Sequence, residues 1–391
     1  MSDVYIYSAR RTPVGAFNGS LASVPATRLG SLSIAAALQD SGFSAEQVDQ
    51  CIMGNVLTSG NGQAPAKQAS LGAGLPDSVS CLTINKVCGS GLKAVMLGAD
   101  AIRLQAAKVA VVGGMENMSL SPHLMSKSRR GYRMGPVTLE DALIKDGLWD
   151  PYSNQHMGNL AEMCARENKL SRQAQDEFAT RSYEKALAAQ ADGLFDKEMV
   201  AVEIKTRRGS TSVSEDEEPK KVKFDKIPTL RPAFEKTGTI TAANASKIND
   251  GAAALVIADQ SLASETSAKP LARIIGYTAF SHAPEWFTTA PIYAMQNLLK
   301  KANKQASDID LYEINEAFSV VTMAAQNALA LTDEQINVHG GAVALGHPIG
   351  ASGARILTTL AHALHTQDKT LGMASLCIGG GEAVAILIER V

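Results

Sequence analysis

The chain contains two copies of one pattern, and this internal duplication constrains its fold more than any other feature. The segment LQDSGFSAEQVD at 38–49 aligns without a gap with LKKANKQASDID at 299–310. Each copy reads as the end of a helix, a polar link and then a strand that Val48 or Ile309 opens. A duplicated unit often forms its site at the seam between the copies.

Two further matches follow in the same order along the chain. GSGLKA after Cys88 aligns with ASGARI after Gly350, and a glycine turn recurs as VVGGMEN from Val111 and as CIGGGEA from Cys377. Three matches in register predict two α/β units related by pseudo-two-fold symmetry. The many glycines and few aromatic residues also favour the α/β class.

Apolar spacing locates the elements around the first glycine motif. A helix is predicted just past Cys88, and 108–112 reads as a buried strand. Between the copies, 119–250 changes character and is predicted to be an inserted loop domain. Most residues of its charged stretch at 207–226 are interpreted as a solvated hairpin, of which at most a few touch a ligand. The apolar residues that define the helix are Leu92, Val95, Met96, Ala99 and Ile102.

Charge and cysteine content exclude several classes of function. A net charge of -2 and a pI near 6.4 provide no global field for nucleic acid. Five cysteines without a CxxC motif indicate neither a disulfide framework nor a zinc site, so no metal is expected. Neither a targeting peptide nor a membrane span is indicated, and a reduced, cytoplasmic protein is predicted.

Cys88 is the first candidate for catalysis. It lies between a strand-like run and the start of a helix, where unpaired N–H groups and the helix dipole stabilise a thiolate. The alternative is a small core residue, which is the commoner role of a buried cysteine. GSGLKA also fits a weak dinucleotide-binding pattern, so an NAD-dependent oxidoreductase is a second hypothesis. The motif is not in the first βαβ unit and lacks the following acidic residue, so close backbone packing explains the glycines better.

Three further residues stand on glycine-rich or strand-end positions. His347 follows Gly346 on a rigid turn and is suited to move protons, although it could be only a hydrogen-bonded turn residue. Cys377 precedes Gly379 and two more glycines, whose N–H groups can form an oxyanion hole. Asn315 ends a strand at the same predicted edge, and its alternative role, like that of Glu316, is a helix cap.

Taken together, these motifs resemble the thiolase family over nearly the whole chain. The resemblance implies a five-layer α/β/α/β/α core of two similar halves plus a loop domain that helps to bind CoA. The implied divisions are 1–118 for the N-terminal half with the nucleophile, 119–250 for the loop domain, 251–270 for the end of the first half, and 271–391 for the C-terminal half. The motifs that carry it are NKVCGSGLKAV, RPAF, GTITAANAS, NEAF, GGAVALGHPIGASGAR and CIGGG.

By this resemblance, the activity is acetyl-CoA C-acetyltransferase, which joins two acetyl-CoA into acetoacetyl-CoA and CoA reversibly through acetyl-Cys88. His347 would take the thiol proton, and Cys377 would remove a proton from the second acetyl-CoA. His347 and a water positioned by Asn315 would hold the enolate, while the N–H groups of Cys88 and Gly379 would hold the oxyanion. A CoA thioester would be the substrate, with no tightly bound cofactor and a homotetramer (a dimer of dimers) as the assembly.

The implied CoA contacts lie mostly in the loop domain. Relatives often have an arginine near the adenine, and this chain has Lys220 or Lys221 there instead. Alternatively, the basic cluster Arg129, Arg130 and Arg133 attracts the CoA phosphates. Phe318 would line the acyl end, and Phe287 stands where family members vary between methionine and phenylalanine. The remaining predicted contacts are Leu148, His156, Met157, Phe234, Ala242, Ala245 and Ser246.

Alternatives within the same class remain. A degradative 3-ketoacyl-CoA thiolase would accept longer chains, although the sequences NKVCGSG and HPIGASGAR are similar to the acetoacetyl-CoA branch. A β-ketoacyl synthase would not need Cys377, and a non-catalytic acyl-CoA carrier would not need three reactive residues.

Overall fold

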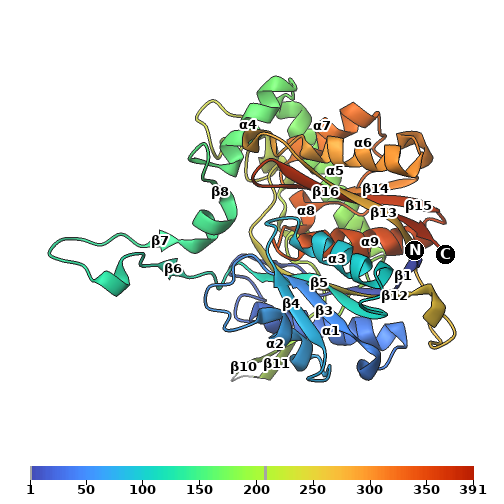
Figure 1. Cartoon of the computed structure of the whole chain (residues 1–391). Helices are drawn as coiled ribbons and strands as arrows, with labels where there is room; N and C mark the ends of the chain where they lie inside the picture. Colours follow the sequence, from blue (N-terminus) through green and yellow to red (C-terminus); the bar gives the residue numbers. More distant parts are fainter. Residues whose placement is uncertain (1, 207–208) are drawn as a thin grey trace.

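The computed structural model describes residues 2–206 and 209–391 and consists of two α/β halves with a loop region on one side (Figure 1). The strands run in the order β14-β15-β16-β13-β1-β12-β5-β3-β4, and β2 (Gly15–Ala16) pairs with β12. The first half contributes β1 (Val4–Arg11), β3 (Gln50–Gly54), β4 (Ser80–Ile84), β5 (Val109–Asn117) and β12 (Asn249–Asp259). The second contributes β13 (Ala272–Ser281), β14 (Leu311–Ile314), β15 (Leu371–Ile378) and β16 (Glu382–Arg390).

The strand pairings of the halves match one another. In the first half, β3 runs parallel to both β5 and β4. In the second half, β14 runs parallel to β15 on one side, and on its other side Tyr312 forms a parallel bridge with Ile336. β12 and β16 are then antiparallel to these central strands. The two halves meet at β1 and β13, which pair through only two residue pairs. The predicted duplication is therefore confirmed in the sheet topology.

Helices cover the sheets in layers, as Figure 1 shows. Helices α1 (Ala26–Ser41) and α2 (Pro65–Gly72) lie outside the first sheet, and α6 (Ala290–Ala302) and α7 (Ser319–Leu329) lie outside the second. Between the sheets lie α3 (Ser90–Arg103) and α9 (Ser352–Thr366). Side chains alternate along each strand, so that Val112 of β5 packs in the middle layer while Val111 packs under α1 and α2. The five-layer order follows from these faces.

The first repeated segment is duplicated down to its hydrogen bonds. Helices α1 and α6 both end at a left-handed residue, Gly42 with φ 69° and Asn303 with φ 52°, before the short turns η1 (Ala45–Gln47) and η8 (Ala306–Asp308). Asp49 then accepts the N–H groups that begin β5, at 2.7 and 3.1 Å, and Asp310 accepts those that begin β15, at 3.0 and 2.8 Å. The prediction that Val48 and Ile309 open the strands was wrong by two residues, because each caps its short turn instead.

The inserted region is built from short elements and two longer helices. It carries a long arm that projects from the body (Figure 1), and the arm contains strands β6 and β7. Its elements are β6 (His123–Leu124), η2 (Ser128–Arg130), β7 (Glu140–Asp141), η3 (Leu143–Leu148), β8 (Trp149–Asp150), β9 (Gln155–His156), α4 (Met157–Glu167), α5 (Arg172–Ala191), β10 (Val202–Thr206), β11 (Gly209–Val213), η4 (Pro219–Lys221) and η5 (Phe224–Thr229). The remaining short elements are η6 (Gln260–Leu262), η7 (Pro284–Trp286) and α8 (Ala342–Leu345).

Most of the described residues of the charged stretch are exposed, as predicted, but a few of them are buried in contacts with the body of the protein. Its strand β11 forms an exposed hairpin with β10, whereas residues 207 and 208 lie outside the described residues. Asp216 is fully buried and binds the Arg11 guanidinium, with Nη1 and Oδ1 2.7 Å apart. Glu217 accepts the N–H of Ala16 at 2.7 Å. These carboxylates fasten the inserted region to the first strand of the chain.

The glycine pair of VVGGMEN does not form the turn that was predicted. Gly113 and Gly114 lie inside β5, which runs on to Asn117. A Cβ on Gly114 would lie 2.1 Å from the carbonyl oxygen of Gly350, so the glycine is needed where the His347 loop crosses the strand. Among the described residues, no helix is long and apolar enough to cross a membrane.

Candidate active site

Cys88 lies at a strained turn between β4 and α3. The preceding residue, Val87, has φ 46°, a left-handed conformation that is costly for a β-branched side chain and is often found at functional sites. Ser90 stabilises the turn because its hydroxyl accepts the N–H of Lys86 at 2.8 Å and donates to the Val87 carbonyl at 2.7 Å. Cys88 as a whole residue is only partly buried.

The thiol of Cys88 is more weakly acidic than the sequence predicted. Burial raises its pKa to about 12, while the N–H groups of Gly379 and of Cys88 itself act in the opposite direction. The expectation that the helix N-terminus would keep a thiolate was therefore wrong, because desolvation outweighs it. A neutral thiol at this position needs a base before it can attack.

His347 is held in the form that can serve as this base. Its Nδ1 lies 2.6 Å from the Ser352 hydroxyl oxygen, and that hydroxyl donates its one hydrogen to the Pro348 carbonyl at 2.9 Å. Ser352 can then only accept from Nδ1–H, which leaves the lone pair on Nε2. Nε2 is buried and has no partner among the described residues. Burial, followed by the charge of Arg355, lowers the His347 pKa to about 4, so the ring is neutral at pH 7.

The crossing of α3 and α9 brings Cys88 and His347 to the same end of the middle layer. A Cβ on Gly91 would lie 2.7 Å from the backbone nitrogen of Ala354, and one on Gly353 would lie 2.4 Å from that of Leu92. The glycines of GSGLKA are thus explained by helix packing rather than by a dinucleotide. Cys88 lies two residues before the start of α3, and His347 lies five residues before the start of α9.

Cys377 lies near the end of β15 and is fully buried. Burial and the neighbouring Cys88 sulfur raise its pKa well above the usual value, which places the two thiols close together. After it, Gly380 and Gly381 have φ 93° and 82°, whereas Gly379 does not have a positive φ. A left-handed backbone therefore requires glycine at only two of the three positions. The N–H of Gly379 is directed at Cys88.

Asn315 follows β14 directly and is not a helix cap. Helix α7 begins only at Ser319, and Glu316 instead accepts hydrogen bonds from Ser182, Asn337 and Val343. The Asn315 N–H donates to the Ser375 carbonyl at 3.0 Å, two residues before Cys377. Neither atom of its buried side-chain amide has a partner among the described residues. The amide is free to bind a polar group in the site.

Aromatic side chains form a continuous row beside Cys377. His156 stacks on Phe234 with ring centroids 4.8 Å apart, Phe234 meets Phe318 at 6.0 Å, and Phe318 meets Phe287 at 6.5 Å. Met157, Ala245, Phe287 and Phe318 share one apolar cluster with Cys377. Leu148 packs instead with Cys88 and Ile349. The structure thus gathers most of the predicted acyl and pantetheine contacts around the two cysteines.

A separate cavity of about 330 Å³ is rich in lysine, and its wall includes Ala243, two residues before the Ala245 that pairs with Phe318 of the row. Ala242 lines this cavity. Ser246, four residues further along, donates its N–H to the Ala317 carbonyl at 3.0 Å. Lys221 lines the cavity, whereas Lys220 pairs with Glu215 at the surface, so of the two lysines the structure brings Lys221 to the site. The other lining residues are Tyr183, Glu218, Val222, Lys223, Lys226, Ile227, Leu230, Ala243 and Lys247.

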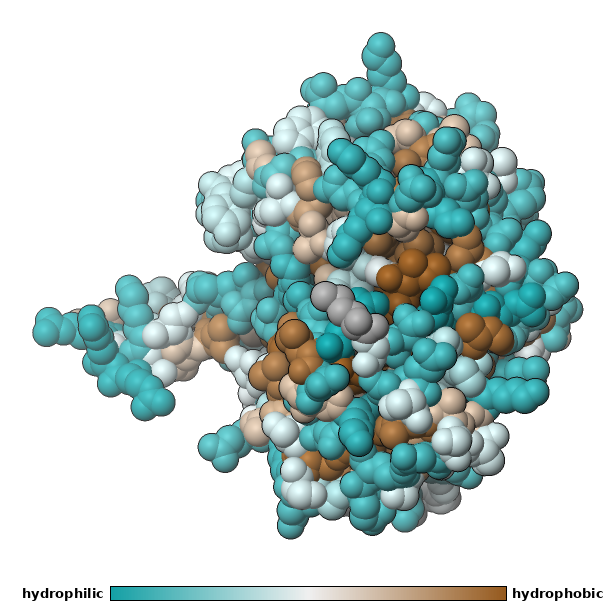
Figure 2. Space-filling model, turned by 45° about the vertical axis from the view of Figure 1, so that its right-hand side comes forward, coloured by the Kyte–Doolittle hydropathy of each residue, from teal (hydrophilic) through white to brown (hydrophobic). Residues whose placement is uncertain are grey.

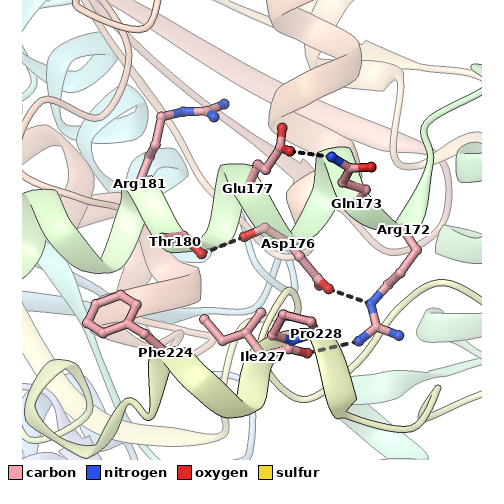
Figure 3. Close-up of a pocket in the computed structure, with 9 residues that line it drawn as sticks. All are labelled: Arg172, Gln173, Asp176, Glu177, Thr180, Arg181, Phe224, Ile227 and Pro228. Atoms are coloured by element: carbon pink, nitrogen blue, oxygen red, sulfur yellow. Dashed lines mark hydrogen bonds and ion pairs between the residues drawn. The ribbon is translucent and has the colours of Figure 1, made fainter.

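A different cavity, of about 690 Å³, lies between α5 and η5 (Figure 3). An ion pair of Arg172 with Asp176, 2.7 Å long, crosses its rim, and Arg172 also donates to the Ile227 carbonyl. None of the predicted site residues lines it. The basic cluster Arg129, Arg130 and Arg133 is also away from the site, on the exposed part of the chain that forms the projecting arm (Figure 1).

Sequence reasoning missed three residues that support this site. Ser352 could have been found, since it stands in the same motif five residues after His347. Asn249 accepts the His347 N–H at 2.9 Å, and Glu116 accepts the N–H of Gly350 at 2.9 Å. The partners in these two contacts are separated by 98 and by 234 positions in the sequence, so no local pattern predicts them. Burial raises the Glu116 pKa to about 7.

Comparison with known proteins finds matches over nearly the whole chain. The family models "Thiolase, N-terminal domain" and "Thiolase, C-terminal domain" match residues 4–261 and 268–390. Relatives named acetyl-CoA acetyltransferase include those of Schizosaccharomyces pombe, 49% identical over 100% of this chain and 99% of theirs, and of Escherichia coli, 50% identical over 100% of both.

Solved structures also match over the whole chain. A thiolase from Ascaris suum in complex with coenzyme A is 44% identical, with a TM-score of 0.94 and full coverage of both chains. The acetyl-CoA acetyltransferase of Bacillus anthracis is 39% identical, with a TM-score of 0.98 over 100% of this chain and 99% of that one. The layered, duplicated fold that the motifs implied is thereby confirmed.

Proposed function

Because the chain belongs to the thiolase family, we propose that Cys88, His347 and Cys377 carry out the reversible joining of two acetyl-CoA into acetoacetyl-CoA and CoA. The protein is an acyltransferase, and its activity is that of an acetyl-CoA acetyltransferase. The observation that carries the residue assignment is the neutral His347 with its free Nε2, held at the helix crossing beside Cys88.

The first half-reaction transfers one acetyl group to the enzyme. Nε2 of His347 takes the Cys88 proton, and the thiolate attacks the acetyl carbonyl, whose oxyanion accepts the N–H groups of Cys88 and Gly379. The carbon–sulfur bond to CoA breaks, and the departing CoA thiolate takes the proton of Cys377. The products are CoA and acetyl-Cys88, and the enzyme keeps an ion pair of His347 imidazolium and Cys377 thiolate.

The second half-reaction uses this ion pair. The Cys377 thiolate removes a methyl proton from a second acetyl-CoA, and the enolate oxygen accepts from imidazolium and from a water held by Asn315. The enolate carbon attacks acetyl-Cys88. The Cys88 sulfur then leaves and recovers its proton from His347, so all protons are returned. The electrons of the new bond come from the enolate, and no tightly bound cofactor is needed.

The substrate path runs from the loop region to the two cysteines. The pantetheine would lie along the row of His156, Phe234 and Phe318, near Leu148 and Met157. The adenosine phosphates would bind in the lysine-rich cavity, where Lys221 takes the role expected of Lys220. The substrate therefore binds between the loop domain, 119–250, and the two halves formed by 1–118 with 251–270 and by 271–391.

Phe287 and Phe318 favour short acyl groups. Both rings are buried in the apolar cluster of Cys377, and they leave little space for a longer chain. A series of 3-ketoacyl-CoA substrates of increasing length should show the highest kcat/KM for acetoacetyl-CoA. Broad activity on long chains would instead identify a degradative enzyme.

The projecting arm supports a homotetramer, a dimer of dimers. It exposes Met125, Tyr132, Met134, Val137 and Leu139, which a stable protein usually covers (Figure 2). Light scattering would measure the mass, and a variant without the arm should fall to dimers. The five free cysteines fit a reducing compartment, and we place the enzyme in the cytoplasm.

The activity is tested by supplying acetoacetyl-CoA and CoA and measuring acetyl-CoA by chromatography. Two acetyl-CoA should form for each acetoacetyl-CoA consumed, and a Cys88→Ala variant should form none. Consumption of acetoacetyl-CoA with an unchanged acetyl-CoA content would contradict the proposal.

A further inference from the structure

One lysine joins the CoA side of the site to the histidine side. Nζ of Lys247 donates to the carbonyl of Ala245 at 2.9 Å and to that of Val343 at 3.1 Å, and it lies 5.3 Å from the centre of the Tyr183 ring. Within the described parts of the chain, no carboxylate lies at ion-pairing distance from this ammonium. Its charge is therefore stabilised by carbonyl dipoles and an aromatic face.

The same short segment holds the His347 loop at two points. Lys247 binds Val343 in α8, four residues before His347, and Asn249 accepts the N–H of His347 itself at 2.9 Å. Val343 is held from its other side, since its N–H donates to Glu316 at 3.0 Å. The position of the catalytic imidazole therefore depends on where segment 245–249 lies.

The segment also forms the wall of the substrate path. Ala245 pairs with Phe318, and Ser246 donates its N–H to Ala317 at 3.0 Å. Lys247 lines the lysine-rich cavity together with Ala242 and Ala243. A movement at the CoA end of this segment would be transmitted to α8 through the ammonium.

We propose that Lys247 is a positioning residue whose ammonium fixes the CoA-binding segment 242–246 against α8, and so couples acyl-CoA binding to the placement of His347. This inference rests on the proposed function. A lysine suits the role because a compact ammonium has three donors, two of which two carbonyls use here, and a longer or uncharged side chain would not reproduce that geometry.

The protonation state of Lys247 gives the role a pH signature. Burial lowers its pKa to about 8, and the charges of Glu218 and Glu316 oppose that effect. The phenol of Tyr183 and the ammonium groups of Lys221, Lys223 and Lys226 also face this cavity. The charged form makes the contacts, so KM for acetyl-CoA should rise as pH increases through about 8.

The test compares Lys247→Met with Lys304→Met, which removes an exposed lysine from the loop after α6. Single-turnover acetylation of Cys88 by acetyl-CoA gives KM and the maximal rate for each protein. Lys247→Met should raise KM at least about tenfold with a smaller loss of maximal rate, and its KM should no longer depend on pH near 8. Lys304→Met should behave as the unaltered protein.

A second variant separates positioning from folding. Methylammonium should lower the raised KM of Lys247→Ala, because it can supply the missing cation between the carbonyls. An unaltered KM in Lys247→Met, or a loss in both variants that is confined to the maximal rate and is not restored by methylammonium, would overturn the role of Lys247 alone. Absence of acetylation in the unaltered protein would overturn the proposed function as well.

Discussion

The Nδ1 of His347 lies 2.6 Å from the hydroxyl oxygen of Ser352, and this one contact sets the tautomer of the catalytic imidazole. Because the Ser352 hydroxyl donates to Pro348, it accepts from Nδ1–H and leaves Nε2 as the base. The histidine is thus prepared to remove a proton from a thiol that burial keeps protonated.

Replacing Ser352 with alanine should slow the acetylation of Cys88 about ten- to hundredfold, since the ring loses its fixed tautomer and orientation. Stopped-flow measurement of the single-turnover rate with acetyl-CoA would check this. The matched Ser41→Ala variant removes a hydroxyl at the end of α1 that donates to the Leu38 carbonyl and accepts the Phe43 N–H, away from the site, and it should keep the full rate. Equal rates in all three proteins would show that Ser352 does not orient the base.

Replacing Cys377 with alanine should separate the two half-reactions. Acetyl-Cys88 should still form, because the departing CoA thiolate can take its proton from the His347 imidazolium instead. Condensation should fall at least about a hundredfold, because the base for the methyl proton is gone. Cys164→Ala is the control, since Cys164 is buried in the same apolar cluster and has no assigned step. Mass spectrometry follows the acyl-enzyme, and chromatography follows acetoacetyl-CoA. Condensation at an unaltered rate without Cys377 would require another base.

Replacing Asp216 with alanine should lower the free energy of unfolding by about 3–5 kcal/mol, because it leaves Arg11 buried beside only Glu198. Glu215→Ala removes a neighbouring carboxylate that is 58% exposed and pairs with Lys220, and it should cost less than about 1 kcal/mol. Denaturant titration measures both values. Similar small losses would mean that the buried pair does not fasten the inserted region to β1.

The share of the folding stability that His347 contributes should fall as the pH is lowered from about 6.5 towards 4, whereas buried carboxyls with raised pKa values, such as Glu116, change stability in the opposite direction. Burial lowers the His347 pKa from 6.5 to about 4, so in this range the unfolded chain takes up a proton at His347 that the folded protein does not. The contribution is fully present above pH 6.5 and is lost as the pH falls, by up to about 3 kcal/mol. Denaturant titrations at several pH values should show a shallower slope for His347→Asn.

The matched control for this pH dependence is His123→Asn, which removes an exposed histidine and should keep the slope of the unaltered protein. Other buried histidines, His339 and His362, also have lowered pKa values and retain part of the slope in the variant. An identical slope in His347→Asn would contradict the neutral, desolvated ring described for the site.

Much of the fold was predictable because the duplication is local and periodic. Asp49 and Asp310 occupy equivalent positions in an ungapped match, and each begins the next strand of its sheet through the same pair of hydrogen bonds. The common site of Cys88, His347 and Cys377 was an expectation from the family resemblance, and it stays a prediction that the proposed experiments test.

The electrostatics of the site could not be read from local sequence. The prediction of a Cys88 thiolate considered only the helix that follows it, whereas the pKa is set by protein packed around the sulfur, including the segment of Gly379. The buried role of Asp216 depends on Arg11, 205 residues away, so the sequence did not single this residue out from the exposed majority of the charged run. Residues so far apart in the chain show no regular sequence spacing from which their contact could be predicted.

The most direct test of the whole account is intact-protein mass spectrometry after mixing with acetyl-CoA, followed by peptide mapping. We predict one added acetyl group, located on Cys88, which disappears when free CoA is supplied and never forms in Cys88→Ala. No adduct, or an adduct on another residue, would contradict the assignment of Cys88 as the nucleophile.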